Sequence, residues 1–304
     1  MPSYSDIYNE LKKIKTANML KNEPLSRHTT LRIGGPADIL AIPKDLAGLQ
    51  QILNITKGIK KYVIGNGSNL LIPDRGLRGI VIKISGGMNK VDINGRLVTV
   101  GGGTLIQSLL RKLAYEGLSG LEFASWVPAA MGGAIAMNLG AFGDEIGDLI
   151  EYVEVLDQNG RSYKLSRSDL KFSYRKSNIT DRILTSAMLK LNYRQKHLIK
   201  KRIEEVIAKR RELQPTSVPS AGSIFKNPKD VPAGKLIDMA GCKGLRIGGA
   251  EVSKKHANFI INLGDAKASD VKKLIHKVKT VVKDKFKVNL ELELVDSSKL
   301  NMLF

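Results

Sequence analysis

KYVIGNGSN, residues 61–69, is the stretch that decides how the fold is interpreted. It has the pattern of a strand that runs into a loop of glycine and asparagine. Small residues in such a loop can present successive backbone N–H groups to an anion without interference from a Cβ atom. The loop lacks the third glycine of a Rossmann fingerprint and the Lys-Ser/Thr pair of a P-loop, so neither standard nucleotide motif is present. A plain tight loop is the alternative.

Two further glycine-rich stretches follow in the same part of the chain. GGGT (101–104) opens a helix, and PAAMGGAIAMNLGAFG (128–143) comes soon after it. Loops of this kind let the backbone approach a large flat or phosphorylated ligand closely. Three of them in one α/β body therefore favour a ligand of that kind.

Strands and helices alternate from Leu31 to Tyr193. The pattern predicts an N-terminal helix over 5–20 capped by Ser5, strands over 38–43 and 79–84, and helices over 44–58 and 104–116. Between them, 61–69 is a strand that runs into the glycine and asparagine loop. Asn94-Gly95 and Asn159-Gly160 mark tight hairpins, because both turn positions tolerate a positive φ. Antiparallel pairing is therefore expected within this α/β body.

The composition changes near residue 195, where we expect a domain boundary. A long basic helix over 196–213 and a proline-punctuated loop over 215–228 lead into a smaller α+β unit. The pattern there predicts helices over 233–239 and 269–285, a strand over 258–262 and a closing strand over 288–295.

The predicted closing strand, VNLELELV (288–295), alternates between apolar and polar residues. Val288, Leu290, Leu292 and Leu294 are expected on one face, and Asn289, Glu291, Glu293 and Val295 on the other. Two glutamates therefore share a face, which is also what a water-facing strand edge would show. In the same way, Ser223 in SAGSIFKNP (220–228) and Arg175 in FSYRKS (172–177) are unremarkable by themselves.

Cysteine and histidine usage argues against several classes of site. Cys242 is the only cysteine of the 304 residues, so an intrachain disulfide and a thiolate zinc site are both excluded. The four histidines have no paired spacing, and no G-x-S-x-G elbow occurs, so neither a metal site nor a hydrolase triad is expected. No apolar run is long enough for a signal peptide or a membrane helix, so the chain is expected in the cytoplasm.

The formal net charge of +20 attracts anions of any kind. A nucleic acid is one candidate, but the lysines are spread along the chain and aromatic residues make up only 5% of it, few for base stacking. We therefore expect no nucleic-acid partner.

Eight of these stretches occur together in an order that resembles the UDP-N-acetylenolpyruvoylglucosamine reductase family. The resemblance runs from about residue 20 to 295. It is carried by HTTLRIGGPAD (28–38), GNGSNLL (65–71), GLSGLEFA (117–124), GGAIAMNLGAFG (132–143), FSYRKS (172–177), PSAGSIFKNP (219–228), IGGAEVSKKHANFIIN (247–262) and LELE (290–293).

The resemblance implies an α+β fold, with an FAD-binding body of the vanillyl-alcohol-oxidase (PCMH) type and a C-terminal α+β substrate-binding cap. The corresponding ranges are an N-terminal helix over 1–20, the FAD-binding domain over 21–195 with subdomains of about 21–84 and 85–195, and the cap over 196–304. The residues implied for FAD are Gly65, Asn66, Gly67, Ser68, Asn69, Gly102, Pro128, Gly132, Gly133, Asn138 and Gly140.

The activity implied is the reduction of UDP-N-acetylenolpyruvoylglucosamine to UDP-N-acetylmuramate in peptidoglycan synthesis, with NADPH recharging the flavin. Ser223 matches the proton donor, Arg175 the cation that polarises the carboxylate, and Glu293 the acid partner. Asn227, Lys226 and Arg211 match substrate contacts. A flavin oxidase or dehydrogenase of the same fold is the alternative.

Two departures from the family pattern are visible. SWVPAAMGG (125–133) has Trp126, Ala129 and Ala130 where a Gly-Ile-Pro-Gly-Thr/Ser run is expected, and Leu139 and Phe142 replace the usual Ala and Tyr. No long insertion separates Arg175 from Ser223, which suggests the shorter, type II form of the family. A monomer is expected, with no membrane partner.

Overall fold

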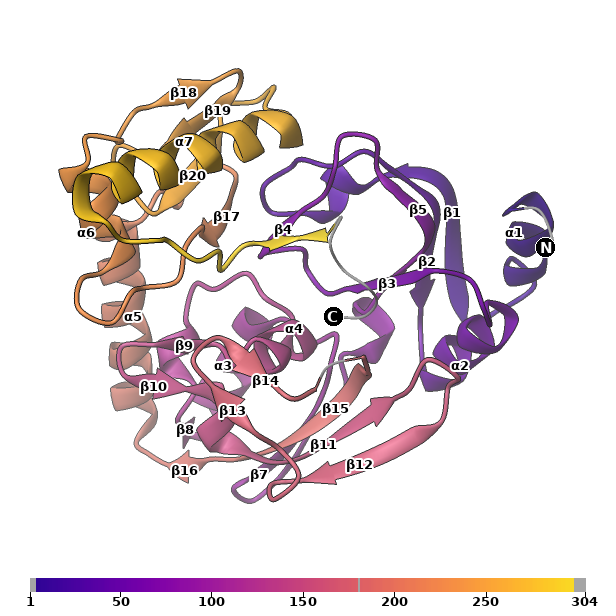
Figure 1. Cartoon of the computed structure of the whole chain (residues 1–304). Helices are drawn as coiled ribbons and strands as arrows, with labels where there is room; N and C mark the ends of the chain where they lie inside the picture. Colours follow the sequence, from indigo (N-terminus) through magenta and orange to yellow (C-terminus); the bar gives the residue numbers. More distant parts are fainter. Residues whose placement is uncertain (1–3, 180, 298–304) are drawn as a thin grey trace.

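Three sheets of four or five strands organise the computed structural model, which describes residues 4–179 and 181–297 (Figure 1). The first comes from the N-terminal part, the second from the middle and the third from the C-terminal part of the chain. Each sheet packs against a buried apolar cluster, and the first sheet has a second one. The mixed helix and strand content confirms the predicted α+β fold class.

The first sheet has the strand order β1-β2-β5-β3. Its strands are β1 (Ala17–Pro24), β2 (Pro36–Pro43), β5 (Leu77–Lys83) and β3 (Lys61–Ile64). β2, β5 and β3 run parallel, and β1 pairs antiparallel to β2. α2 (Leu46–Ile55) begins after Asp45, whose carboxylate accepts from the Gly48 N–H at 2.7 Å. All four residues of β3 are buried, so the 65–69 loop leaves from a fixed strand end.

The N-terminal helix is shorter than predicted. α1 covers Tyr4–Leu11 and buries Ile7 and Leu11, whereas the sequence pattern predicted a helix over 5–20. Residues from Ala17 onward form β1 instead, because pairing with β2 gives their backbone groups partners along the edge of the first sheet.

The second sheet is antiparallel with the order β12-β11-β15-β7-β6. Its strands are β6 (Val91–Asn94), β7 (Leu97–Gly101), β11 (Ile150–Leu156), β12 (Ser162–Ser166) and β15 (Ile183–Lys190). Both hairpins predicted from Asn-Gly pairs are confirmed, since β6 pairs with β7 and β11 with β12. α3 (Ile106–Glu116) ends at Gly117, whose φ of 74° suits a glycine C-cap. α4 (Met131–Ala136) lies in the same apolar cluster.

The third sheet, of order β17-β20-β19-β18, follows the long helix α5 (Lys196–Leu213). Its strands are β17 (Ser220–Ser223), β18 (Arg246–Ile247), β19 (Ala250–Val252) and β20 (Phe259–Asn262), and its helices are α6 (Ala233–Met239) and α7 (Ala268–Phe286). α5 and α6 have the predicted bounds, and α7 extends the prediction by one residue at each end.

Several short elements connect these units. The two-residue strands outside the three sheets are β4 (Leu70–Leu71), β8 (Leu118–Ser119), β9 (Gly140–Ala141), β10 (Asp144–Glu145), β13 (Phe172–Ser173), β14 (Lys176–Ser177), β16 (Asn192–Tyr193) and β21 (Val295–Asp296). Single 3-10 turns cover Leu25–His28, Gly86–Met88, Glu122–Ala124 and Ile146–Leu149.

The predicted closing strand over 288–295 is mostly not a strand. Only Val295–Asp296 is one, β21, and it pairs in parallel with β4 rather than with the third sheet (Figure 1). The residues before it bond to an irregular loop, through Lys226 N–H to the Glu291 carbonyl at 2.9 Å and Glu293 N–H to the Ile224 carbonyl at 2.9 Å. The chain thus returns from the third sheet to the first.

Direct hydrogen bonds also connect the first sheet's loops with the third sheet's unit. Thr30 Oγ1 donates to the Ser220 carbonyl at 2.7 Å, and Asn262 Nδ2 donates to the Leu31 carbonyl at 3.0 Å. Asp74 accepts from the N–H groups of Ala268 and Ser269 at 2.6 and 3.0 Å and so caps α7 from 194 residues away.

Within the described ranges no helix is both long and apolar enough to cross a membrane.

Replacement of Asp74 by Ala is expected to lower the free energy of unfolding by about 1 kcal/mol at pH 7, the usual value of a helix N-cap. Burial alone would raise the pKa of Asp74, but the N–H groups of Ala268 and Ser269 hold it below its ordinary value. The cap therefore stabilises fully above about pH 4 and is lost as the pH falls through the folded-state pKa.

Urea unfolding at pH 7 and at pH 3 measures this difference, with the exposed Asp230→Ala as the charge-matched control. A deficit for Asp74→Ala that is as large at pH 3 as at pH 7 would contradict the capping role.

Candidate active site

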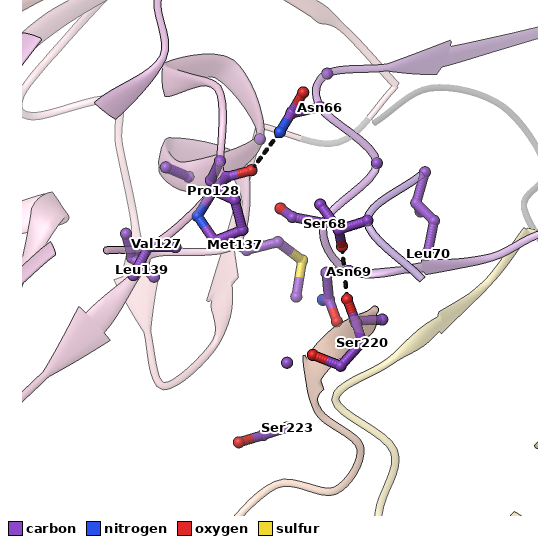
Figure 2. A pocket seen from close by; sticks show the side chains of 18 of the residues that line it. Asn66, Ser68, Asn69, Leu70, Val127, Pro128, Met137, Leu139, Ser220 and Ser223 are labelled. Atoms are coloured by element: carbon purple, nitrogen blue, oxygen red, sulfur yellow. Dashed lines mark hydrogen bonds between the residues drawn. The ribbon is translucent and has the colours of Figure 1, made fainter. Parts of the chain in front are cut away.

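A cavity of about 790 Å³ lies where loops of all three sheets meet. Its volume is in the upper part of the range typical of small-molecule and cofactor sites. The wall is formed by residues 63–70, parts of 126–142, residues 214–223, and single side chains that include Arg175 and Glu293. Figure 2 shows Asn66 and Pro128 on one side of this cavity and β17 with Ser220 and Ser223 on the opposite side.

The loop predicted to bind an anion, 65–69, lines the cavity along its whole length. Among the described residues, the backbone N–H groups of 66–69 have no acceptor, so they remain available to a ligand. Gly67 has a φ of 63°, and a Cβ atom there would lie 2.2 Å from the His28 carbonyl oxygen. Asn66 Nδ2 donates to the Pro128 carbonyl at 2.7 Å and joins this loop to the glycine-rich stretch 128–143 (Figure 2).

The remaining glycines predicted to contact a cofactor divide into two groups. Gly133 lines the cavity, as does the predicted Pro128, and a Cβ atom on Gly133 would meet open space. Gly102 and Gly132 lie behind the wall, where the Gly132 N–H donates to the Gly102 carbonyl at 2.8 Å. A Cβ atom on Gly102 would lie 2.3 Å from the Leu184 carbonyl oxygen. These two glycines therefore permit close backbone packing that supports the wall.

Arg175 occupies the second turn position of the hairpin between β13 and β14. Its φ of 57° is a left-handed conformation that costs a residue with a Cβ atom roughly 1–2 kcal/mol. The hairpin thus holds strain at the position that directs the guanidinium toward the cavity, as is common at functional sites.

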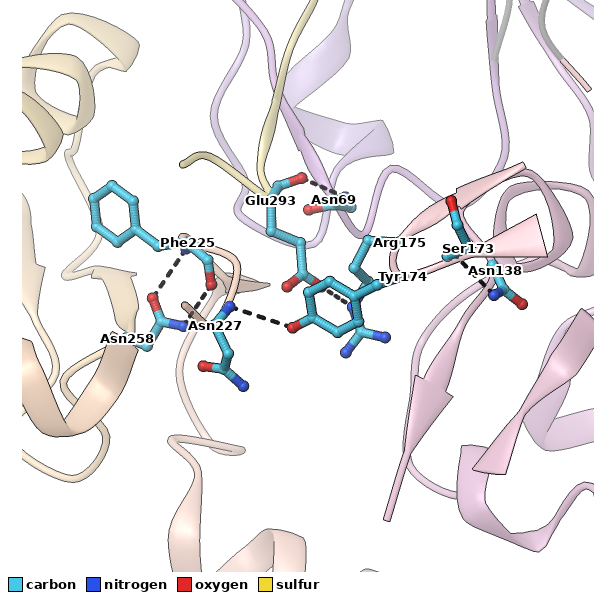
Figure 3. Close-up of polar contacts among 9 residues, drawn as sticks. All are labelled: Asn69, Asn138, Ser173, Tyr174, Arg175, Phe225, Asn227, Asn258 and Glu293. Atoms are coloured by element: carbon cyan, nitrogen blue, oxygen red, sulfur yellow. Dashed lines mark hydrogen bonds and ion pairs between the residues drawn. The ribbon is translucent and has the colours of Figure 1, made fainter. Parts of the chain in front are cut away.

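Glu293 pairs with this guanidinium. Arg175 Nε donates to Glu293 Oε1 at 2.7 Å, and the side chains are only 19% and 16% exposed (Figure 3). Burial raises the pKa of the Glu293 carboxyl above its ordinary value, while the charges of Arg175 and Lys226 and the hydrogen bond from Arg175 act in the opposite direction. The Glu293 backbone is fixed as well, because Asn69 Nδ2 donates to its carbonyl at 3.0 Å.

Ser223 is the last residue of β17 and lines the same cavity. The carbonyl of the next residue, Ile224, accepts from the Glu293 N–H at 2.9 Å, which brings the serine and glutamate segments together. In the part of the chain that the structure describes, the Ser223 hydroxyl has no hydrogen-bond partner. The three side chains predicted to be catalytic therefore meet at one cavity.

Asn138 and Gly140 support Arg175. The Asn138 side chain is fully buried and does not line the cavity; Nδ2 donates to Glu145 at 2.6 Å and to the Ser173 carbonyl at 3.0 Å, and Oδ1 accepts from Gly147. It thereby holds the first strand of the arginine hairpin (Figure 3). Gly140 lines the cavity, and a Cβ atom there would come within 3.3 Å of Arg175 Nη1.

The three residues predicted to contact substrate lie outside the cavity wall. Arg211 stacks on Trp126, with the guanidinium 4.6 Å from the ring centre. Lys226 pairs with the exposed Glu291 at 3.7 Å. Asn227 accepts from the Ala233 N–H at 3.1 Å through Oδ1, and its own N–H donates to the Tyr174 hydroxyl at 3.3 Å. Asn227 remains close to the cavity, because Tyr174 is the neighbour of the wall residue Arg175.

Several wall residues were not predicted from the sequence, chiefly Arg210, Gln214, Met137 and Phe259. Arg210 is adjacent to Arg211, which the sequence predicts as a substrate contact, and the basic run at the end of α5 is the available signal for it. Met137 and Phe259 carried no polar signal at all. No group of three or more His, Cys, Asp or Glu side chains able to hold a metal ion occurs over 4–179 and 181–297.

Comparison with protein families matches both parts of the chain. Residues 37–166 match the FAD binding domain model, and residues 214–295 match the model "UDP-N-acetylenolpyruvoylglucosamine reductase, C-terminal domain". FAD is therefore the cofactor, and the fold is the PCMH-type FAD-binding body joined to the C-terminal domain of these reductases.

Individual relatives match nearly the whole chain. UDP-N-acetylenolpyruvoylglucosamine reductase from Bacillus licheniformis is 42% identical over 292 residues, which cover 94% of this chain and 96% of the relative. The reductase from Moorella thermoacetica is 45% identical over 279 residues, or 91% and 92% of the two chains.

The crystal structure of the enzyme from Thermus caldophilus superposes with a TM-score of 0.80 at 39% identity and covers 92% of this chain and 98% of that one. The chain belongs to the UDP-N-acetylenolpyruvoylglucosamine reductase family, in its shorter, type II form.

Proposed function

We propose that this chain reduces the enolpyruvyl ether of UDP-N-acetylenolpyruvoylglucosamine to UDP-N-acetylmuramate, with Ser223 as the proton donor to the α-carbon. The family supplies the reductase activity in peptidoglycan synthesis, with FAD and NADPH. The observation that carries the proposed roles is the convergence of Ser223, Arg175 and Glu293 on one cavity. All three come from a single copy of the chain, so we propose that a monomer is active.

The cavity residues fit FAD. The four unused N–H groups of 66–69 suit the pyrophosphate, because such a row of backbone donors stabilises a bound anion. Pro128, Gly133 and Met137 give a wall of small and apolar groups for a flat ring system. We propose that residues 21–195 hold the flavin and that residues 196–304 close over the substrate.

Reduced FAD supplies the hydride, which in this reaction adds to the β-carbon of the enolpyruvyl double bond. The electron pair of that bond then moves to the α-carbon and the carboxylate, which together carry a second negative charge. Arg175 is suited to stabilise it, because Nε is bound to Glu293 whereas both Nη groups lack acceptors among the described residues. A guanidinium held in advance in this way loses little free energy to reorganisation during the reaction.

Ser223 completes the reaction by giving its hydroxyl proton to the α-carbon. A serine is a weak acid in water, but a developing carbanion next to it in a cavity with little water is a strong base. The alkoxide that remains must regain a proton. Glu293 is the candidate relay, because its N–H donates to the carbonyl of Ile224, the residue after Ser223. Burial raises the pKa of its carboxyl, which favours the protonated form at a higher pH than in an exposed glutamate.

Replacement of Gly67 by Ala is expected to release FAD, because the new Cβ atom would lie 2.2 Å from the His28 carbonyl oxygen and displace the 65–69 loop. The matched control is Gly58→Ala: Gly58 has a similar φ of 73°, but a Cβ atom there meets nothing within 4 Å. The ratio of flavin to protein absorbance measures FAD retention. Equal FAD loss in both variants would attribute the effect to backbone strain alone.

Replacement of Ser223 by Ala is expected to leave flavin reduction by NADPH nearly intact and to slow product formation by about 10²–10⁴-fold, the usual range of general acid catalysis. Anaerobic stopped-flow absorbance separates the two half-reactions. Ser220→Ala is the control, because Ser220 lines the same cavity and contributes its carbonyl, not its hydroxyl, to the bond from Thr30. Comparable slowing of both half-reactions by Ser223→Ala would sink the proton-donor role.

Replacement of Glu293 by Gln is expected to reduce turnover far more than Glu291→Gln. The Glu293 side chain is 16% exposed and bound to Arg175, whereas the Glu291 side chain is 78% exposed. Steady-state kcat with saturating NADPH and UDP-N-acetylenolpyruvoylglucosamine gives the comparison. Similar kcat values for the two variants would remove Glu293 from the proposed relay.

A further inference from the structure

Arg210 is a second guanidinium in the wall of the active-site cavity. It lies in the last turn of α5 and lines the cavity together with Arg175. Arg175 lines the same cavity, and after burial its positive charge is the second cause that lowers the pKa of Arg210. Unlike Arg175, however, Arg210 forms no ion pair with any carboxylate in the described ranges.

The hydrogen bonds of Arg210 do not satisfy its guanidinium. Nη2 donates to the Phe123 carbonyl at 3.3 Å and Nη1 to the Gln214 side chain at 3.5 Å, both long and both to neutral acceptors. Nε is completely buried and has no partner. A guanidinium has five N–H donors, and a buried donor left without an acceptor costs about 1–3 kcal/mol.

The charge of Arg210 is also unfavourable without a ligand. Burial, and then the positive charge of Arg175, lower the pKa of the guanidinium from its ordinary value, yet arginine remains charged in proteins. A partly buried cation beside another cation needs an anion nearby to repay its lost hydration. Over residues 4–179 and 181–297 no carboxylate pairs with Arg210, so a ligand that enters the cavity would supply the missing anion.

We infer that Arg210 binds an anion which the active-site ligands bring into the cavity next to Arg175. A planar guanidinium binds a delocalised charge best, through two parallel N–H groups. Two sources carry such a charge at this site: the carboxylate of the enolpyruvyl substrate, and the ring of the flavin when it is reduced to an anion. The inference rests on the proposed function, because both sources belong to that reaction.

Arg211 offers a matched comparison. It is the next residue of the same helix and carries the same charge, but its guanidinium stacks on Trp126 and does not line the cavity. An effect of general basicity, or of the positive end groups that suit a helix C-terminus, would be similar at both positions. An anion site in the cavity would depend on Arg210 more than on Arg211.

The test compares Arg210→Met with Arg211→Met as FAD-loaded enzymes, through two equilibrium readouts. One is the dissociation constant of UDP-N-acetylenolpyruvoylglucosamine from the oxidised enzyme, followed by the change in the flavin spectrum. The other is the midpoint potential of the bound flavin, measured against a reference dye. Neither readout involves proton donation by Ser223, so failure of this inference and failure of the proposed proton donor are distinguishable.

The expected result is at least a tenfold effect of Arg210→Met on one readout and a clearly smaller effect of Arg211→Met on that same readout. A tenfold higher dissociation constant for Arg210→Met identifies the substrate carboxylate as the anion. A tenfold loss of preference for the reduced flavin identifies the flavin, and it lowers a two-electron potential by about 30 mV. Equal values for Arg210→Met and Arg211→Met in both readouts overturn the inference and leave Arg210 as a helix-end residue.

If Arg210→Met does not retain FAD, Arg210→Lys and Arg211→Lys decide the question by the same two readouts. Lysine keeps the charge but lacks the two parallel donors, so the same direction of change with a smaller size is expected at position 210 only. Unchanged values for Arg210→Lys relative to Arg211→Lys would again overturn the inference.

Discussion

The ion pair between Arg175 and Glu293 is the contact on which the active site depends. It joins a hairpin connected to the second sheet to the segment that returns from the third sheet, at 2.7 Å and largely out of water. The surrounding structure is arranged to keep it: Asn138 holds the hairpin, Asn69 holds the Glu293 backbone, and Gly140 leaves room for the guanidinium. The strained φ of Arg175 is tolerated because these contacts fix its position from several sides.

Most of the architecture could be predicted from the sequence, because local patterns determine it. Asn-Gly turns, the Gly117 stop and the amphipathic face of α7 gave hairpins and helices close to those observed. The predictions are wrong where partners far away in the sequence determine the local structure. Residues 17–24 join the edge of a sheet, and the segment over 288–294 bonds to the loop after β17, and neither partner is visible from local spacing.

The residues of the active site also fall into those that local sequence patterns predict and those that depend on distant contacts. Ser223, Arg175 and the 65–69 loop could be found because motif order identifies them. The choice between Arg210 and Arg211 could not, since adjacent helix positions point about 100° apart and only tertiary packing shows which one meets the cavity. Alternation placed Glu291 and Glu293 on one face, whereas the irregular backbone separates an exposed glutamate from a buried one. Asn138 matched a cofactor contact, but its amide is used entirely by the chain.

The return of the chain to β4 has a consequence for how the protein matures during translation. Apart from Val295, every other residue that lines the cavity precedes Glu293 in the sequence, and Val295 and Asp296 pair with Leu70 and Leu71. A nascent chain can therefore assemble its nucleotide cradle while the carboxylate is still inside the ribosome. The reactive centre is completed only once Glu293 has been synthesised and β21 pairs with β4, so a product truncated before Glu293 would keep the 65–69 loop yet lack the carboxylate.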